Sequence, residues 1–190
     1  LKIEKDILNM AVQIEGHPDN VAPAILGGII SGVVKKEEDF KYIKIKPPKN
    51  LKAIVSIPDF YLSTEIARNI LPKEITRKDA IFNISRAALL TSALFSNRLD
   101  LLEIATEDKI HQDYRAKFIP NLNQLFKETK KAGAYSVTIS GAGSSILALT
   151  KDDKNIIEKV SKAMHYSFKK KNINSIIKVL NIPAKGIIIN

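Results

Sequence analysis

The sequence contains no cysteine and no long hydrophobic run, and each absence excludes a class of protein. Without cysteine the chain has no disulfide scaffold, no thiolate metal site and no cysteine nucleophile, which fits a reducing compartment. The apolar stretch at 21–34 is interrupted by Pro23 and by glycines, so it does not resemble the roughly 20-residue segment that spans a bilayer. We therefore expect a soluble, cytoplasmic protein with no membrane partner.

Aromatic residues are also scarce, at 6% of the sequence, although the chain carries a net charge of +10. Such a charge raises the alternative of a basic nucleic-acid-binding α+β module. The lysines are spread along the chain, however, and few aromatic residues lie among them to stack on bases. We favour a solvated lysine-rich surface, which would also attract an anionic substrate such as ATP, and we expect no nucleic-acid partner.

The first 46 residues predict two helices followed by two strands. Apolar residues recur at helical spacing up to Glu15, and Gly27 ends a second, shorter apolar segment. The expected elements are a helix up to residue 15, a helix over 21–26, and strands over 29–34 and 42–45 with a charged turn at 35–39. The prolines and polar residues of 47–50 form the best linker candidate in the chain.

From residue 51 onward the pattern predicts an α+β fold. Ser63 or Thr64 and Thr76 are candidate helix caps, and Pro120 suits a first helical position. The expected order is a strand over 51–57, helices over 63–71, from 76 to 95, over 99–105 and over 120–133, strands over 136–139 and 145–149, a helix over 156–168 and a strand over 176–182. This order predicts an antiparallel sheet with helices on one face, a split-βαβ-like arrangement with extra helices inserted.

The segment from Glu15 to Asn20 gathers two carboxylates, an imidazole and an amide before a predicted helix. Free backbone N–H groups at a helix start favour anions, and the polar side chains can converge on one small ligand. A structural interpretation has about equal weight: Asp19 or Asn20 caps the helix and His17 is incidental. One histidine among acidic residues is weak support for a metal site.

A second candidate is the loop of Ser140, Gly141, Ala142 and Gly143 between two predicted strands. Glycine lets backbone N–H groups approach a phosphate, whereas a tight hairpin is the alternative. The loop is not a dinucleotide-binding fingerprint, because a strand follows it instead of a helix.

Two arginines form the third candidate in a chain that mostly uses lysine. Arg68 follows Ser63 on a predicted helix, and Arg115 follows a polar segment. A guanidinium group binds a carboxylate in a planar fork that lysine cannot match. Other arginines are present, so the residue type alone does not select this pair.

Taken together, these segments resemble the homoserine kinase family of the GHMP small-molecule kinases. The resemblance spans residues 1 to about 183 in the family's order. Its segments are the signature at 15–28, the substrate-arginine helix at 63–72, the stretches at 82–90 and 113–120, and the third GHMP motif at 138–143.

The resemblance implies an α+β fold of the GHMP kinase type. Residues 1–46 would be the C-terminal part of its N-terminal domain, and residues 51–190 its ferredoxin-like C-terminal domain with inserted helices. The family uses ATP and Mg²⁺ to phosphorylate the side-chain hydroxyl of L-homoserine in threonine biosynthesis. Many members of the family are dimers, so the resemblance makes a homodimer a candidate assembly.

The resemblance also assigns roles to residues by position. His17, Asp19 and Asn20 would surround the amino acid, with Asp19 and Asn20 as the catalytic candidates. Arg68 and Arg115 would bind its carboxylate. Residues 140–143 would close the site near the ATP phosphates.

Three departures qualify these expectations. Gln13 stands where the family usually has a glutamate implicated in Mg²⁺ binding. Either Glu15 is the metal ligand instead, or the metal is bound by the nucleotide and by the family's N-terminal segment. Ser144 stands where the third motif usually has proline. The family's N-terminal phosphate loop is not in the sequence, so we expect these 190 residues alone not to turn over ATP. A catalytically dead amino-acid-sensing domain is the alternative within the family.

Overall fold

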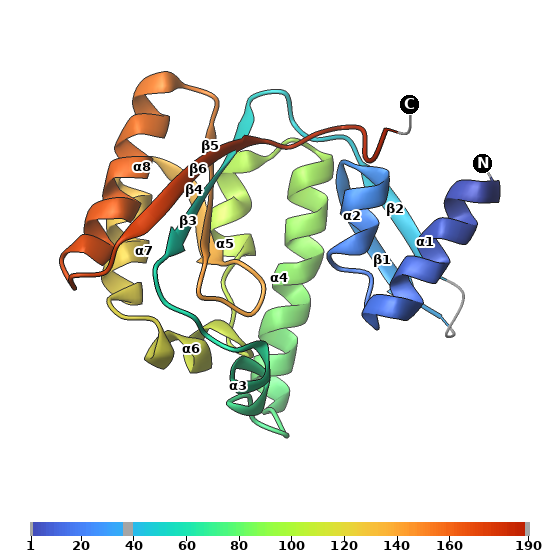
Figure 1. Cartoon of the computed structure of the whole chain (residues 1–190), viewed down its shortest axis with the longest axis horizontal. Helices are drawn as coiled ribbons and strands as arrows, with labels where there is room; N and C mark the ends of the chain where they lie inside the picture. Colours follow the sequence, from blue (N-terminus) through green and yellow to red (C-terminus); the bar gives the residue numbers. More distant parts are fainter. Residues whose placement is uncertain (1, 36–39, 189–190) are drawn as a thin grey trace. The chain divides into compact units, whose positions relative to one another are not determined.

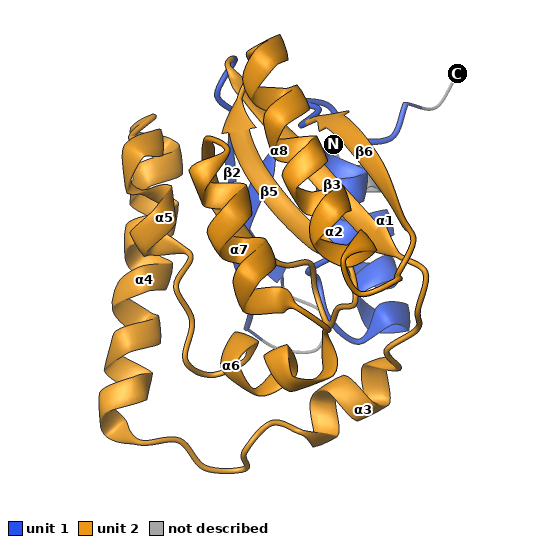
Figure 2. Cartoon of the chain, turned by 90° about the vertical axis from the view of Figure 1, so that its left-hand side faces the viewer, with its two compact units in different colours: residues 1–49, 182–190 blue, residues 50–181 orange. Residues whose placement is uncertain are grey.

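A computed structural model of the chain describes residues 2–35 and 40–188. Their contacts divide the chain into two compact units (Figure 2). Unit 1 comprises residues 1–49 and 182–190, and unit 2 comprises residues 50–181. In the described part of the chain, no helix is long and apolar enough to cross a membrane.

Unit 1 combines two helices with a two-stranded antiparallel sheet (Figure 1). Its elements are α1 (Lys2–Glu15), α2 (Val21–Leu26), β1 (Ile29–Val34) and β2 (Phe40–Ile45). Leu8, Val12, Ala22 and Phe40 form its buried apolar core. The predicted elements are confirmed, and β2 begins two residues earlier than expected because Phe40 pairs with Val34. Most of the predicted charged turn, residues 36–39, lies outside the described residues.

The C-terminal segment groups with unit 1, whereas the sequence analysis placed it with the second segment. The backbone N–H of Gly28 donates to the carbonyl of Pro183 at 2.7 Å. Gly27 has φ of +68°, and a Cβ there would lie 2.2 Å from the backbone carbon of Lys185. Glycine at 27 therefore provides both the conformation and the space that the returning chain requires.

Unit 2 is built on a four-stranded antiparallel sheet in the order β4-β5-β3-β6. The strands are β3 (Leu51–Pro58), β4 (Ala134–Ile139), β5 (Ile146–Lys151) and β6 (Ser175–Asn181). Val137 opposes Ala148, and Ala148 opposes Ile54, so the register places these three side chains on one face. This sheet confirms the predicted α+β class.

Two helices cover that face, α7 (Leu122–Lys131) and α8 (Lys154–Lys169). They lie side by side against the sheet (Figure 2). Leu125, Val160, Met164 and Phe168 are fully buried at 0% exposure and fill the layer between helices and sheet. Ile146 is equally buried from the strand side, so the main core of unit 2 lies here.

The inserted helices lie on the opposite face, which the sequence analysis did not predict. They are α4 (Arg77–Phe95), the 3₁₀ turn η1 (Leu99–Leu101) and α5 (Leu102–Ala105). Leu90 and Leu94 of α4 line a cavity of about 340 Å³ together with Leu147 and Leu149 of β5. Because β5 is apolar on both faces, it requires a cover on each side.

Local signals fixed most helix boundaries in unit 2. Ser63 caps α3 (Thr64–Asn69) by accepting from the N–H of Ile66 at 3.0 Å, and Thr76 caps α4 in the same way. The prediction for Pro120 is wrong, because α7 begins at Leu122. Asn121 precedes it in a left-handed conformation, and its side-chain amide donates to the carbonyl of Ser167 at 2.8 Å. A bond to α8 therefore sets this boundary.

Candidate functional site

Arg115 joins two segments at one end of unit 2. It ends the short helix α6 (Gln112–Arg115), which lies at the same end of the unit as α3 (Figures 1 and 2). Its Nε donates to the carbonyl of Ala67 on α3 at 3.1 Å, and its Nη1 donates to the carbonyl of Gly141 at 3.0 Å. Two of the five N–H donors of the guanidinium therefore fix its plane against α3 and the glycine loop.

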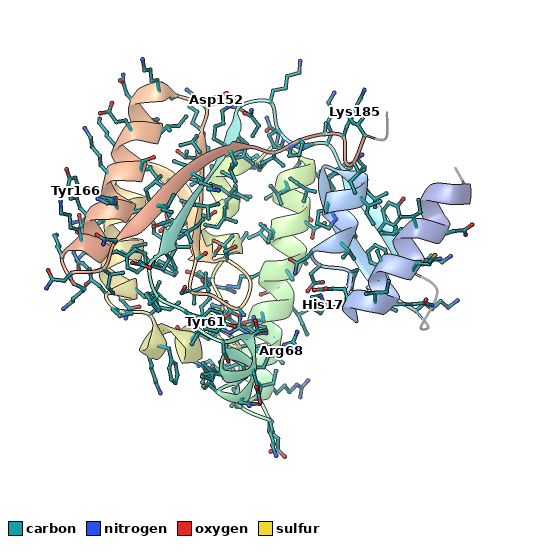
Figure 3. The ribbon with its side chains drawn as sticks, in the orientation of Figure 1. His17, Tyr61, Arg68, Asp152, Tyr166 and Lys185 are labelled. Atoms are coloured by element: carbon teal, nitrogen blue, oxygen red, sulfur yellow. The ribbon has the colours of Figure 1, made fainter. Side chains whose placement is uncertain are left out.

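The pKa of Arg115 lies below its usual range, chiefly because the side chain is partly buried. The positive charge of Arg68 lowers it further, whereas the carboxylate of Asp108 raises it. Arg68 occupies the last turn of α3, and Figure 3 places it at the same end of unit 2 as Tyr61. The structure therefore brings the two predicted arginines within electrostatic reach of each other, an arrangement that a carboxylate would stabilise.

The loop from Ser140 to Gly143 connects β4 to β5 and closes on itself. The N–H of Ser140 donates to the carbonyl of Ser145 at 2.8 Å, and the N–H of Gly143 donates to the carbonyl of Ser140 at 3.0 Å. Gly141 and Gly143 have φ of +57° and +95°. The loop is therefore a tight turn in which Gly141 presents its carbonyl to Arg115. Binding of a phosphate by its backbone N–H groups stays a prediction.

In unit 1 the structure addresses the capping alternative directly. Asn20 occupies the N-cap position of α2, but its side chain makes no capping hydrogen bond. The first turn is held by the N–H of Ala22, which donates to the carbonyl of Pro18 at 2.9 Å. Asp19 is exposed and lines a small hollow of about 70 Å³ with Pro18 and Pro23. The side-chain amide of Asn20 therefore does not serve as a cap of α2.

Glu15 and His17 lie at the C-terminal end of α1, with Nε2 of His17 at 3.8 Å from a carboxylate oxygen of Glu15. The negative end of a helix dipole favours a cation there. Gln13 lies two residues earlier on α1, and residues two apart on a helix do not share a face. The side chain of Glu15 therefore does not occupy the position of the Gln13 side chain. Within 2–35 and 40–188, no group of three or more His, Asp or Glu side chains could hold a metal ion.

Sequence reasoning missed a polar cluster behind Arg115. Asp108, Asn83 and Gln112 link α4, the segment before α6 and the end of β4 by hydrogen bonds. Asp108 lies three residues before His111 and four before Gln112, and its carboxylate accepts from the backbone N–H groups of both. That spacing was the available signal. The contribution of Asn83, 25 residues away, has no local signal.

Part of the chain matches a known protein family, and several relatives are similar over most of it. Residues 89–166 match the family described as "GHMP kinases C terminal". The chain is 45% identical over 178 residues to a homoserine kinase of Persephonella marina, covering 94% of this chain and 58% of that protein. It is 41% identical to a homoserine kinase of Clostridium botulinum, covering 99% of this chain and 62% of that protein.

A solved structure agrees with these sequence matches. The crystal structure of homoserine kinase from Cytophaga hutchinsonii superposes with a TM-score of 0.88 at 32% identity, covering 96% of this chain and 59% of that one. The chain thus carries the C-terminal fold of the GHMP kinases, as expected. Within that class its similarity is to the homoserine kinases, and it spans about three-fifths of the length of these relatives.

Proposed function

We propose that the protein containing this chain transfers the γ-phosphoryl group of ATP to the side-chain hydroxyl of L-homoserine. The product is O-phospho-L-homoserine, which serves threonine biosynthesis. In this proposal unit 1 belongs to the N-terminal domain of a GHMP kinase and unit 2 is its C-terminal domain. The similarity to proteins named homoserine kinase supports the choice of substrate.

The pairing of Arg115 with the glycine loop is the observation that carries the proposal. Its guanidinium is held at 3.0 Å from the carbonyl of Gly141 and lies within electrostatic reach of Arg68. A fixed planar donor beside a second positive charge suits the carboxylate of an amino acid. The glycine loop next to it suits a phosphate-bearing partner.

Phosphoryl transfer requires mainly positioning and charge neutralisation from the protein. In the proposal, Arg68 and Arg115 hold the homoserine carboxylate, and His17, Asp19 and Asn20 contact its other polar groups. Asp19 is the candidate that accepts the proton of the attacking hydroxyl. Residues 140–143 are proposed to lie near the ATP phosphates. Their loop is already closed by internal hydrogen bonds, which reduces the cost of ordering it.

Mg²⁺ would neutralise the charge that develops on the phosphoryl oxygens. Glu15 fits as one carboxylate ligand, because it is exposed at the negative end of α1. One carboxylate is enough for a magnesium ion that is also bound by substrate phosphates. The neutral amide of Gln13 is a poor ligand for this ion.

A coupled ADP-release assay tests the function. The complete gene product that contains these 190 residues is compared with the 190-residue chain, each with L-homoserine, mevalonate, galactose or no acceptor. We expect ADP release from the complete protein only with L-homoserine and none from the 190-residue chain. Turnover by the short chain contradicts its expected dependence on further sequence, and ADP release with another acceptor contradicts the substrate.

The same samples distinguish the two alternatives from the sequence. An amino-acid-sensing domain binds L-homoserine, as measured by calorimetry, without releasing ADP. A nucleic-acid-binding module shows binding to generic RNA that weakens steeply with added salt.

A further inference from the structure

Asp108 is the centre of a hydrogen-bond network at the start of α6, the helix that carries Arg115. Its side chain is only 14% exposed. One carboxylate oxygen accepts from the N–H of His111 at 2.7 Å and from that of Gln112, and the other accepts from the N–H of Ile110 at 3.2 Å. The carboxylate therefore binds the backbone at the start of α6, the helix that ends at Arg115.

Asn83 attaches the same cluster to the long helix α4. Its side-chain amide donates to Asp108, and its side-chain oxygen accepts from the N–H of Lys109 at 2.9 Å. Asn83 therefore holds the segment before α6 at two adjacent points. This double attachment fixes the position of the carboxylate relative to α4.

Gln112 connects the network to the glycine loop. Its side-chain oxygen accepts from the N–H of Ile139, the last residue of β4, at 2.9 Å, and its amide donates to the carbonyl of Thr106 at 3.2 Å. Arg115, one helical turn later, donates to Gly141 inside the loop. The four-residue helix α6 thus binds the backbone at two points, at Ile139 just before the loop and at Gly141 within it.

Charge adds to this arrangement. Burial by itself raises the pKa of Asp108, but hydrogen bonds from Gln112, Asn83, His111 and Ile110 bring the pKa below its ordinary value. The carboxylate is therefore negative at neutral pH and attracts the guanidinium of Arg115, whereas the positive charge of Arg68 repels that guanidinium. Asp108 therefore both accepts hydrogen bonds from the start of α6 and supplies a counter-charge for Arg115.

We infer that Asp108, supported by Asn83 and Gln112, is a positioning residue for the kinase reaction. It sets α6 so that the guanidinium of Arg115 and the loop at 140–143 are held in one geometry. The inference rests on the function proposed above and deepens it, because it names residues that act on the substrate through Arg115 and the loop.

A double-mutant cycle in the complete protein tests the coupling. Asp108→Asn removes the charge while retaining the size, and we expect the kcat/KM for L-homoserine to fall by about 10- to 100-fold through a raised KM for L-homoserine. In the Arg115→Ala background the same change should cost less than about 3-fold, because the residue through which it acts is gone. Full additivity of the two losses overturns the inference.

Control variants separate positioning from simple loss of stability. Asp108 and Asp113 both line a cavity of about 410 Å³, and Asp113 lies within α6. Asp113→Asn should leave kcat/KM within about 2-fold. Asn83→Ala should reproduce part of the Asp108→Asn loss, since it removes one of the attachments. Equal losses in Asp113→Asn and Asp108→Asn would mean that any change in α6 acts on activity, which contradicts a specific role.

Amide hydrogen exchange provides a readout that does not depend on activity. In the wild type, exchange at Ile139 should be slow because its N–H is bonded to Gln112. Asp108→Asn should accelerate exchange at Ile139 and over 140–145, while the buried strand β3 stays protected. If the wild type shows no homoserine-dependent ADP release, the function proposed above fails, and unchanged exchange in Asp108→Asn separately overturns the positioning role.

Discussion

The two units hold their candidate site residues in different ways. In unit 2, Arg115 is fixed by side-chain bonds to the backbone of α3 and of the glycine loop. In unit 1, Asp19 and Asn20 lie exposed on a turn, and the Asn20 side chain makes no bond to the helix that it precedes. The arginine is therefore preorganised for a ligand, whereas the polar turn has more freedom to adjust to one.

This difference suggests that the two units contribute to different steps, unit 2 to substrate binding and unit 1 to turnover. A preorganised group loses little entropy on binding and gives geometric specificity, which suits the carboxylate that every amino acid shares. In the proposed reaction, an exposed turn suits the end of L-homoserine that changes. Substitutions in unit 2 should then act mainly on substrate affinity, and those in unit 1 mainly on turnover.

The largest expected effect follows from replacing Arg115. Arg115→Lys keeps the charge but loses the planar fork that binds the carbonyls of Ala67 and Gly141 and that we propose to bind a carboxylate. We expect kcat/KM for L-homoserine to fall by about 100- to 1,000-fold, mostly through KM. Steady-state kinetics of the complete protein measure this, with Arg98→Lys as the control, because Arg98 is exposed and paired with Asp100. A change of less than about 5-fold in Arg115→Lys would contradict the assignment.

A smaller loss, carried by kcat, is expected in unit 1. Asp19→Asn removes the candidate proton acceptor, and general-base catalysis typically contributes about 100-fold or more. The matched control is Asp6→Asn, an exposed carboxylate on α1. An unaltered kcat in Asp19→Asn removes Asp19 as a base. A raised KM with unchanged kcat would instead assign it to binding, and the contrast between the units would disappear.

The sequence predicted the elements of the fold well where local chemistry sets them. Ser63 and Thr76 cap helices as expected from their own side chains, and Gly27 ends α2. It failed at Asn121, where a bond to Ser167 outweighs the preference of Pro120 for a first helical position. It also missed the second helical layer, because covering both faces of β5 is a property of the assembled sheet.

The candidate site shows the same limit. Among the arginines, residue type alone could not select a pair, and the resemblance to a family was needed. The structure adds that Arg115 is held by two backbone carbonyls, whereas Arg86 and Arg98 form ion pairs with Glu107 and Asp100. Asp108 was not singled out at all. Its role depends on Asn83 and on the strand end at Ile139, which are neighbours only after folding.

Adding a side-chain atom at Gly27, next to the C-terminal segment, should destabilise the folded chain. Gly27→Ala places a Cβ against the backbone of Lys185 and requires a conformation that favours glycine. We expect a loss of about 1–3 kcal/mol in the free energy of unfolding and faster proteolysis within 182–188. Gly16→Ala is the matched control, because Gly16 also has positive φ but no atom within 4 Å of an added Cβ. Equal effects would show that strain alone, not contact with the segment, limits position 27.

The smallest expected effect concerns the pH dependence of the network in unit 2. The pKa of Asp108 is lower in the folded protein than in the unfolded chain, so the unfolded chain binds the proton first as the pH falls. The stabilisation that the carboxylate contributes is therefore fully present above about pH 5 and is lost as the pH falls through the lower, folded value. Urea unfolding of the wild type and of Asp108→Asn should show a stability difference that is constant near neutral pH and shrinks in acid. A difference that stays constant down to pH 2 would mean that the charge of Asp108 does not stabilise the network, and the preorganisation of Arg115 would then rest on packing alone.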